Sequence, residues 1–161
     1  MRAIYFAFVL LAAACGAPVD NAGEPTRAAA TASATLEVRN GWTRPTPGGV
    51  NVSSGYLTIV NGTDAADRLL AASSPRAART EVHEMAMEGG VMRMRAVEGG
   101  LAAPAGETVT LAPGGLHIMF FGVGRPFAEG ETIPLTLTFE RAGQIETTLA
   151  VRAGGASHAG R

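Results

Sequence analysis

The chain has no lysine and only one cysteine, and these shortages exclude several kinds of chemistry. All thirteen basic residues are arginine, so no lysine amine is available to form a Schiff base. The single cysteine, Cys15, cannot close an internal disulfide. Histidine is scarce too, with three in 161 residues, and none lies in a recognisable hydrolytic motif. We therefore expect no enzymatic activity.

The content of charged residues of either sign is also low. Charged residues make up 17% of the chain and the formal net charge is −1, which excludes the basic surface that nucleic-acid binding requires. Hydrophobic residues make up 47%, enough for a packed core, and the length suits one domain.

The N-terminal residues predict export. Arg2 precedes an apolar run at residues 3–14 that is too short to span a bilayer, so residues 1–15 are typical of a signal peptide. Cys15 follows the sequence LLAAA, which resembles a bacterial lipobox, although Ala12 stands where leucine is usual. Lipidation of Cys15 would anchor the protein, and this anchor is the only membrane contact that we expect. Ordinary cleavage nearby, with Cys15 lost or left as a free thiol, is the alternative.

Residues 16–34 are rich in Ala, Gly, Pro, Thr and Ser and predict a flexible linker, while residues 154–161 predict a disordered tail. Between them, residues 35–153 contain about eight short apolar segments separated by Gly and Pro turns, without a long helical stripe. This pattern predicts a single all-β domain, either a Greek-key β-sandwich or a barrel.

Methionine and histidine are concentrated in one window of this domain. Apart from Met1, every methionine lies between Met85 and Met119, and His83 and His117 lie in or beside the same window. The third histidine, His158, is in the C-terminal tail, and we expect at most a weak accessory metal contact from it.

Gly89 and Gly90 predict a two-residue hairpin turn because glycine tolerates positive φ. Side chains alternate along a strand, so this register segregates the two faces of the hairpin. One face carries His83, Met85, Met87, Met92 and Met94. The other carries Glu84, Glu88, Arg93 and Arg95, with Glu84 opposite Arg95 as an ion pair.

Two His/Met pairs could form one metal site. His83 is diagonal to Met94 across the hairpin, and His117 shares a strand face with Met119. Together they would give two imidazole nitrogens and two thioether sulfurs. Neutral thioether sulfur suits Cu(I), whereas Zn²⁺ prefers thiolate, imidazole or carboxylate and Ca²⁺ and Mg²⁺ prefer oxygen. The same methionines could instead be core packing, since methionine is a flexible core filler.

This pattern resembles the periplasmic copper chaperones of the PCuAC type. The family motif is a His, ten residues, a Met, some twenty-one residues and then His-x-Met. His83 and Met94 have the family spacing, and twenty-two residues then precede His117-Ile118-Met119, one more than usual. The stretches WTRPTPGG, GYLTIVNGTDAADRLLAASSP and VHEMAMEGGVMRM are also similar, so the resemblance covers residues 36 to 152.

The resemblance implies a cupredoxin-like β-sandwich that binds Cu(I) through His83, Met94, His117 and Met119, with Met85 and Met87 as auxiliary donors or packing. It also implies a copper recipient, such as subunit II of a cytochrome oxidase or another copper chaperone. We expect a periplasmic monomer whose four ligands converge, partly accessible, at one end or edge of the sandwich.

Other copper proteins fit less well. A blue-copper carrier needs a cysteine thiolate, and the only cysteine lies in the signal region. A copper oxidase needs more histidines. A membrane-tethered β-sandwich that binds proteins without metal stays as the alternative.

Overall fold

The computed structural model describes residues 35–153, which form ten strands and no helix. The strands are β1 (Leu36–Thr43), β2 (Val52–Asn61), β3 (Asp67–Ser73), β4 (Ala77–Glu88), β5 (Val91–Ala96), β6 (Leu101–Ala103), β7 (Thr108–Leu111), β8 (His117–Val123), β9 (Thr132–Phe139) and β10 (Gly143–Val151). Among these residues no helix is long and apolar enough to cross a membrane.

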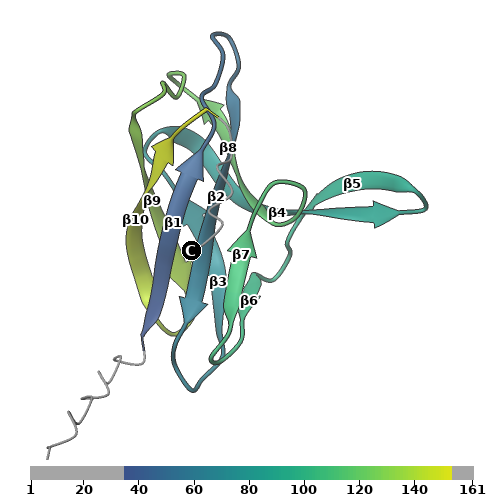
Figure 1. Cartoon of the computed structure of the whole chain (residues 1–161), viewed down its shortest axis with the longest axis vertical. Helices are drawn as coiled ribbons and strands as arrows, with labels where there is room; N and C mark the ends of the chain where they lie inside the picture. Colours follow the sequence, from purple (N-terminus) through teal and green to yellow (C-terminus); the bar gives the residue numbers. More distant parts are fainter. Residues whose placement is uncertain (1–34, 154–161) are drawn as a thin grey trace, which may run out of the picture. The chain divides into compact units, whose positions relative to one another are not determined.

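The strands form one continuous sheet in the order β5-β4-β8-β2-β1-β10-β9-β3-β6. Every pairing is antiparallel except β1 with β10. Strand β2 is shared, because residues 52–55 pair with β8 and residues 57–60 pair with β7. The sheet folds over so that β9, β10 and β3 lie behind β1 and β2 (Figure 1), which gives the all-β cupredoxin-like sandwich that the sequence predicted.

One hydrophobic core joins the two layers. Fully buried side chains include Phe120 on β8, Ile59 on β2, Leu137 on β9 and Leu149 on β10. A Cβ at Gly55 would lie 2.7 Å from the Leu149 side chain and 2.9 Å from the Phe120 side chain, so a larger residue there would displace these core side chains. The core fixes which face of β8 points inward and therefore which face is left for a site.

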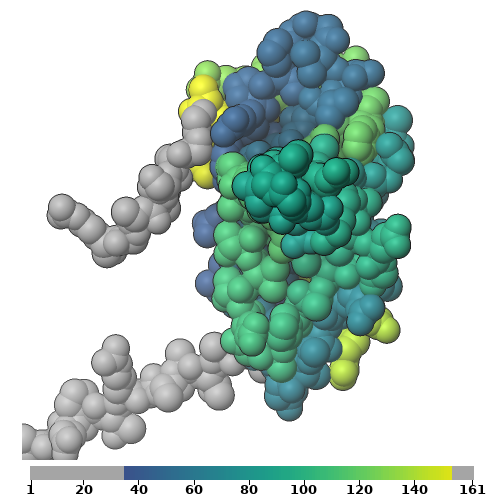
Figure 2. Space-filling model, turned by 90° about the vertical axis from the view of Figure 1, so that its right-hand side faces the viewer, coloured from purple at the N-terminus to yellow at the C-terminus, as the bar shows by residue number. Residues whose placement is uncertain are grey.

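The hairpin of β4 and β5 projects from the sandwich (Figure 1). No residue from 83 to 96 belongs to the described core or to the hydrophobic side chains packed against it. Figure 2 shows the hairpin, in teal, standing in front of the surface toward the viewer.

The structure has more strands than the sequence suggested. Ten replace the expected eight or so, partly because the three-residue β6 is too short to show an apolar alternation. The domain boundaries that we place at residues 35 and 153 remain a prediction. The predicted signal peptide at 1–15, the linker at 16–34 and the tail at 154–161 lie outside the described residues.

Candidate metal centre

The β4–β5 hairpin has the register that the sequence predicted. Gly89 and Gly90 have φ values of 59° and 80°, as a type I′ turn requires. Met87 pairs with Met92 and Met85 with Met94. Glu84 pairs with Arg95 across the other face, with 3.9 Å between Oε2 and Nε.

Strand β4 also pairs with β8 on its other edge, and this pairing brings the two histidines together. His83 lies directly opposite His117, and their ring centroids are 6.1 Å apart. Ile118 is fully buried in the core, so the alternation along β8 turns His117 and Met119 to the outer face. The two histidines thus meet on the outer face of the sheet, where the hairpin leaves the sandwich.

The free nitrogen of His117 faces the sulfur of Met94. His117 Nδ1 is 2.8 Å from the carbonyl oxygen of Gly115, which only accepts hydrogen bonds, so Nδ1 carries the proton. In the neutral ring, Nε2 therefore carries a lone pair, and it lies 3.2 Å from Met94 Sδ. Two atoms that face each other with their lone pairs at this distance are well placed to bind one cation between them.

The free nitrogen of His83 is also identified by its partner. Nε2 lies 2.9 Å from the carboxylate of Glu81, which accepts a hydrogen, so Nε2 is the protonated atom. Nδ1 then carries the lone pair, and it is buried without a hydrogen-bond partner. A buried polar atom without a partner is costly, and a bound metal ion would satisfy it.

Met119 lies on the same face but has a partner of its own. Its sulfur accepts a hydrogen bond from the hydroxyl of Ser54, at 3.3 Å, because β2 pairs Ser54 with Met119. His117 and Met119 are two residues apart on β8, so Met119 is beside the imidazole pair. The structure therefore places His117 against Met94 and opposite His83, and it holds the sulfur of Met119 against Ser54.

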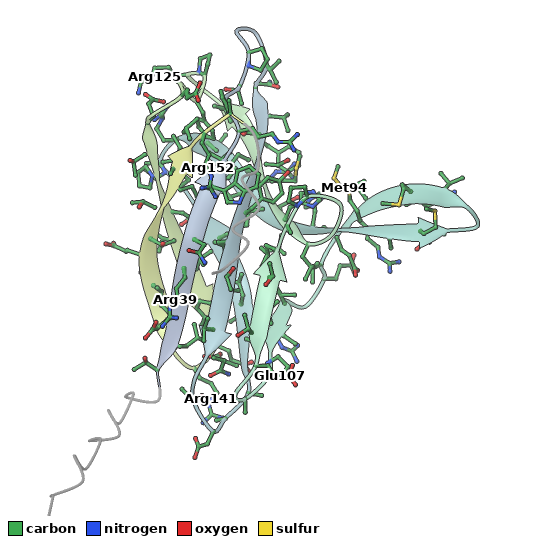
Figure 3. All side chains as sticks on the ribbon, in the orientation of Figure 1. Arg39, Met94, Glu107, Arg125, Arg141 and Arg152 are labelled. Carbon is green, nitrogen blue, oxygen red and sulfur yellow. The ribbon has the colours of Figure 1, made fainter. Side chains whose placement is uncertain are left out.

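The four candidate ligands differ in exposure. His117 is 4% exposed and Met119 7%, whereas Met94 is 50% exposed. Met94 lies at the base of the projecting hairpin (Figure 3). One side of the site is thus fixed by the sheet, and the other side is an accessible thioether on a long side chain.

Sequence analysis missed the residues that orient the histidines. The His83 hydrogen bond holds the pKa of the Glu81 carboxyl below its usual value, against the opposing effect of burial, and Arg79 lowers it further. Arg79 contacts Glu81 at 2.8 Å and lies 4.4 Å over the ring of Phe121. The i, i+2 spacing of Glu81 and His83 was a signal that could have been used. Ser54 and Gly115 depend on pairings between distant strands and left no such signal.

The remaining candidates lie apart from these contacts. Met85 is half-buried next to the centre, and Met87 is 64% exposed farther out along the hairpin. Cys15 and His158 lie outside the described residues. Within residues 35–153, no three side chains of His, Cys, Asp or Glu are grouped as a metal site.

Comparison with known proteins agrees with this fold. The LpqE-like family, described as "Putative lipoprotein LpqE-like", matches residues 36–151. A relative from Leifsonia xyli subsp. xyli, "Putative lipoprotein Lxx21020", is 31% identical over 104 residues, or 65% of this chain and 61% of that protein. The chain thus spans less than two thirds of the length of that relative.

Solved structures share the sandwich. The copper-bound PCuAC domain from PmoF2 is 26% identical with a TM-score of 0.63, over 74% of this chain and 94% of that domain. The solution structure of CuI-DR1885 from Deinococcus radiodurans is 26% identical with a TM-score of 0.57, over 80% and 85%. The class defined here is a cupredoxin-like domain of the PCuAC type. The chain belongs to the LpqE-like family, which is the PCuAC family, as its His/Met motif indicated.

Proposed function

We propose that this protein is a periplasmic Cu(I) chaperone, which holds Cu(I) through His83, Met94, His117 and Met119 and passes it to another protein. The observation that carries the proposal is the 3.2 Å approach of His117 Nε2 to Met94 Sδ, in a ring whose Nδ1 is hydrogen-bonded to Gly115. The unpartnered Nδ1 of His83, in the ring opposite, adds a third donor. The names of the solved relatives, copper-bound and CuI, support the choice of metal.

The donor set supports Cu(I) over other ions. The two neutral thioethers are soft donors that suit Cu(I), whereas Zn²⁺ sites use thiolate, imidazole or carboxylate. A thioether also cannot oxidise to a disulfide in the periplasm.

The uneven exposure of the ligands supports transfer. His117 and Met119 are buried and remain with the sheet, whereas Met94 is half exposed on the hairpin. An incoming donor from a recipient protein would replace Met94 first and then the deeper ligands. This order suits a chaperone, because the buried ligands hold copper until the recipient has supplied its own donors.

Anaerobic titration of the protein with Cu(I) against a competing chelator tests this function. We expect one tight Cu(I) per chain and much weaker Zn²⁺ binding. Met94→Leu and Met119→Leu conserve side-chain volume, so each should leave the melting temperature of the apo-protein nearly unchanged. Each should weaken Cu(I) binding at least tenfold, about 1.4 kcal/mol. Equal Zn²⁺ affinity, or unchanged Cu(I) affinity in both variants, would reject the site.

The location and recipient form the second half of the proposal. Family members are named as lipoproteins, and Cys15 is the residue that we propose to carry the lipid. Cys15→Ser should then move the protein from the membrane to the soluble fraction. A recipient such as cytochrome oxidase subunit II or another copper chaperone should take Cu(I) from the loaded protein on mixing. A wild-type protein that is already soluble would reject the anchor.

A further inference from the structure

The outer half of the β4–β5 hairpin carries two methionines that the site described above does not use. Met87 is 64% exposed and Met92 is 45% exposed. They are directly paired, and they share a strand face with Met85 and Met94. Neither belongs to the described hydrophobic core, so the usual role of methionine as a flexible core filler does not account for them.

The opposite face of the hairpin is also exposed but carries charged side chains in place of thioethers. It carries ion pairs between Arg93 and Glu88, between Arg95 and Glu84, and between Arg95 and Glu88. One face is thus charged and the other is occupied by sulfur, in a segment that water surrounds. The sulfur face thus offers accessible thioethers, which are soft ligands that suit Cu(I).

The ladder places the two methionines of each pair directly opposite each other. The amide of Met85 donates to the carbonyl oxygen of Gly115, just before β8, at 3.2 Å, and so points away from β5. Met85 and Met94 therefore form a pair without backbone hydrogen bonds between them. Pairs of this kind alternate along an antiparallel ladder, so Met87 and Met92 form the next one. Their side chains are the closer kind of cross-strand neighbours, with Cβ atoms about 4.5–5.5 Å apart. Two flexible thioethers at this separation can bind one ion between them.

We propose that Met87 and Met92 form a second, weaker Cu(I) site, which receives copper before it reaches the inner site. This inference rests on the proposed function. The pair Met85–Met94 lies two residues farther in, about 7 Å along the strands, and Met94 already contacts His117. Copper would pass from one sulfur pair to the next and then to the imidazoles, with no change of oxidation state.

Stoichiometric titration with Cu(I), anaerobically and against the colorimetric chelator bicinchoninate, tests the second site. The wild type should bind one Cu(I) tightly and a second at least tenfold more weakly, while sedimentation shows a monomer throughout. The double variant Met87→Leu/Met92→Leu should lose the second Cu(I) and keep the first within twofold. His117→Ala should lose the tight site and keep the weak one.

Val91→Leu is the matched control, because Val91 is an exposed side chain on the charged face of the same hairpin. It should retain both Cu(I) ions. A wild type that binds only one Cu(I), a double variant that still binds two, or a second Cu(I) that binds only by joining two chains would overturn the inference. Absence of the tight site would instead reject the proposed function.

Discussion

The tautomers of His83 and His117 determine which atoms can bind a metal. Each ring donates from one nitrogen, His83 to Glu81 and His117 to Gly115. The donating atom differs, since it is Nε2 in His83 and Nδ1 in His117. Hydrogen bonds of this kind fix the ring and raise its basicity toward a metal. We therefore propose that Glu81 is a positioning residue, which acts on the metal site through His83.

Glu81→Gln should weaken Cu(I) binding about tenfold, at the lower end of the effect usual for such partners. The amide can still accept the His83 hydrogen, but it no longer offers a negative charge. Nitrogen NMR of the apo-protein should show His83 protonated on Nε2 in the wild type and a mixture of tautomers in the variant.

The matched control is Glu84→Gln, which removes a carboxylate from the opposite face of β4. It should change neither the tautomer nor the affinity. If Glu81→Gln binds Cu(I) as well as the wild type does, Glu81 has no positioning role.

At the scale of elements, the β4–β5 hairpin carries both the turn at Gly89–Gly90 and the proposed ligand Met94. The register of this turn could be predicted from the sequence, because a two-residue loop and a two-faced pattern leave one pairing that keeps the faces separate. The contact between β4 and β8 could not be predicted, because residues 83 and 117 are joined only by the global topology. One part of the site therefore comes from a hairpin whose register the sequence predicts, and the other part comes from a strand pairing that only the complete fold determines.

Gly90→Val should weaken Cu(I) binding by up to about tenfold, because a β-branched residue at φ 80° costs about 1–2 kcal/mol and frays the hairpin that holds Met94. The melting temperature of the apo-protein should change little, since the core contains no residue of this hairpin. Titration and thermal melting, run side by side, measure the two effects.

Gly89→Asn is the control for that change. Asparagine tolerates positive φ and is favoured at the first position of a type I′ turn. Affinity should stay at the wild-type level. A loss of affinity in Gly89→Asn as large as that in Gly90→Val would show that the backbone conformation of the turn is not the cause.

At the scale of the whole molecule, stability and copper binding depend on different regions. Asp67, at the start of β3, accepts hydrogen bonds from the amides of Arg68, Arg141 and Ala142 at 2.7–2.9 Å. This carboxylate connects β3 to the turn between β9 and β10. Burial alone would raise the pKa of Asp67, but the three amide hydrogen bonds together lower it below its usual value of 3.8.

Asp67→Asn should destabilise the fold by about 1 kcal/mol at pH 7, because three amides lose a charged acceptor. The folded pKa is lowered, so this contribution is complete above pH 3.8 and disappears as the pH falls through the folded value. Urea unfolding of wild type and variant at several pH values should show the difference shrink in acid.

The exposed Asp64 provides the control, and Asp64→Asn should be nearly neutral. Neither change should alter Cu(I) affinity. A stability difference for Asp67→Asn that grows on acidification would contradict the lowered pKa.

The all-β fold was predictable because short apolar segments between Gly and Pro turns leave a clear pattern in the sequence, as in the alternating buried and exposed positions of β9. The support of the site was less predictable. Ser54 lies 65 positions from Met119 in the chain, and only the β2–β8 pairing brings its hydroxyl to that sulfur. Spacing motifs identify residues on one strand or hairpin, whereas such partners depend on which strands become neighbours.

The central claim is that two imidazoles and two thioethers hold one Cu(I). X-ray absorption at the copper edge, on the protein loaded with a single equivalent of Cu(I), tests this claim most directly. The account predicts two nitrogen and two sulfur neighbours, with one sulfur lost in Met94→Leu. A copper ion surrounded only by nitrogen and oxygen, or a spectrum that Met94→Leu leaves unchanged, would contradict it.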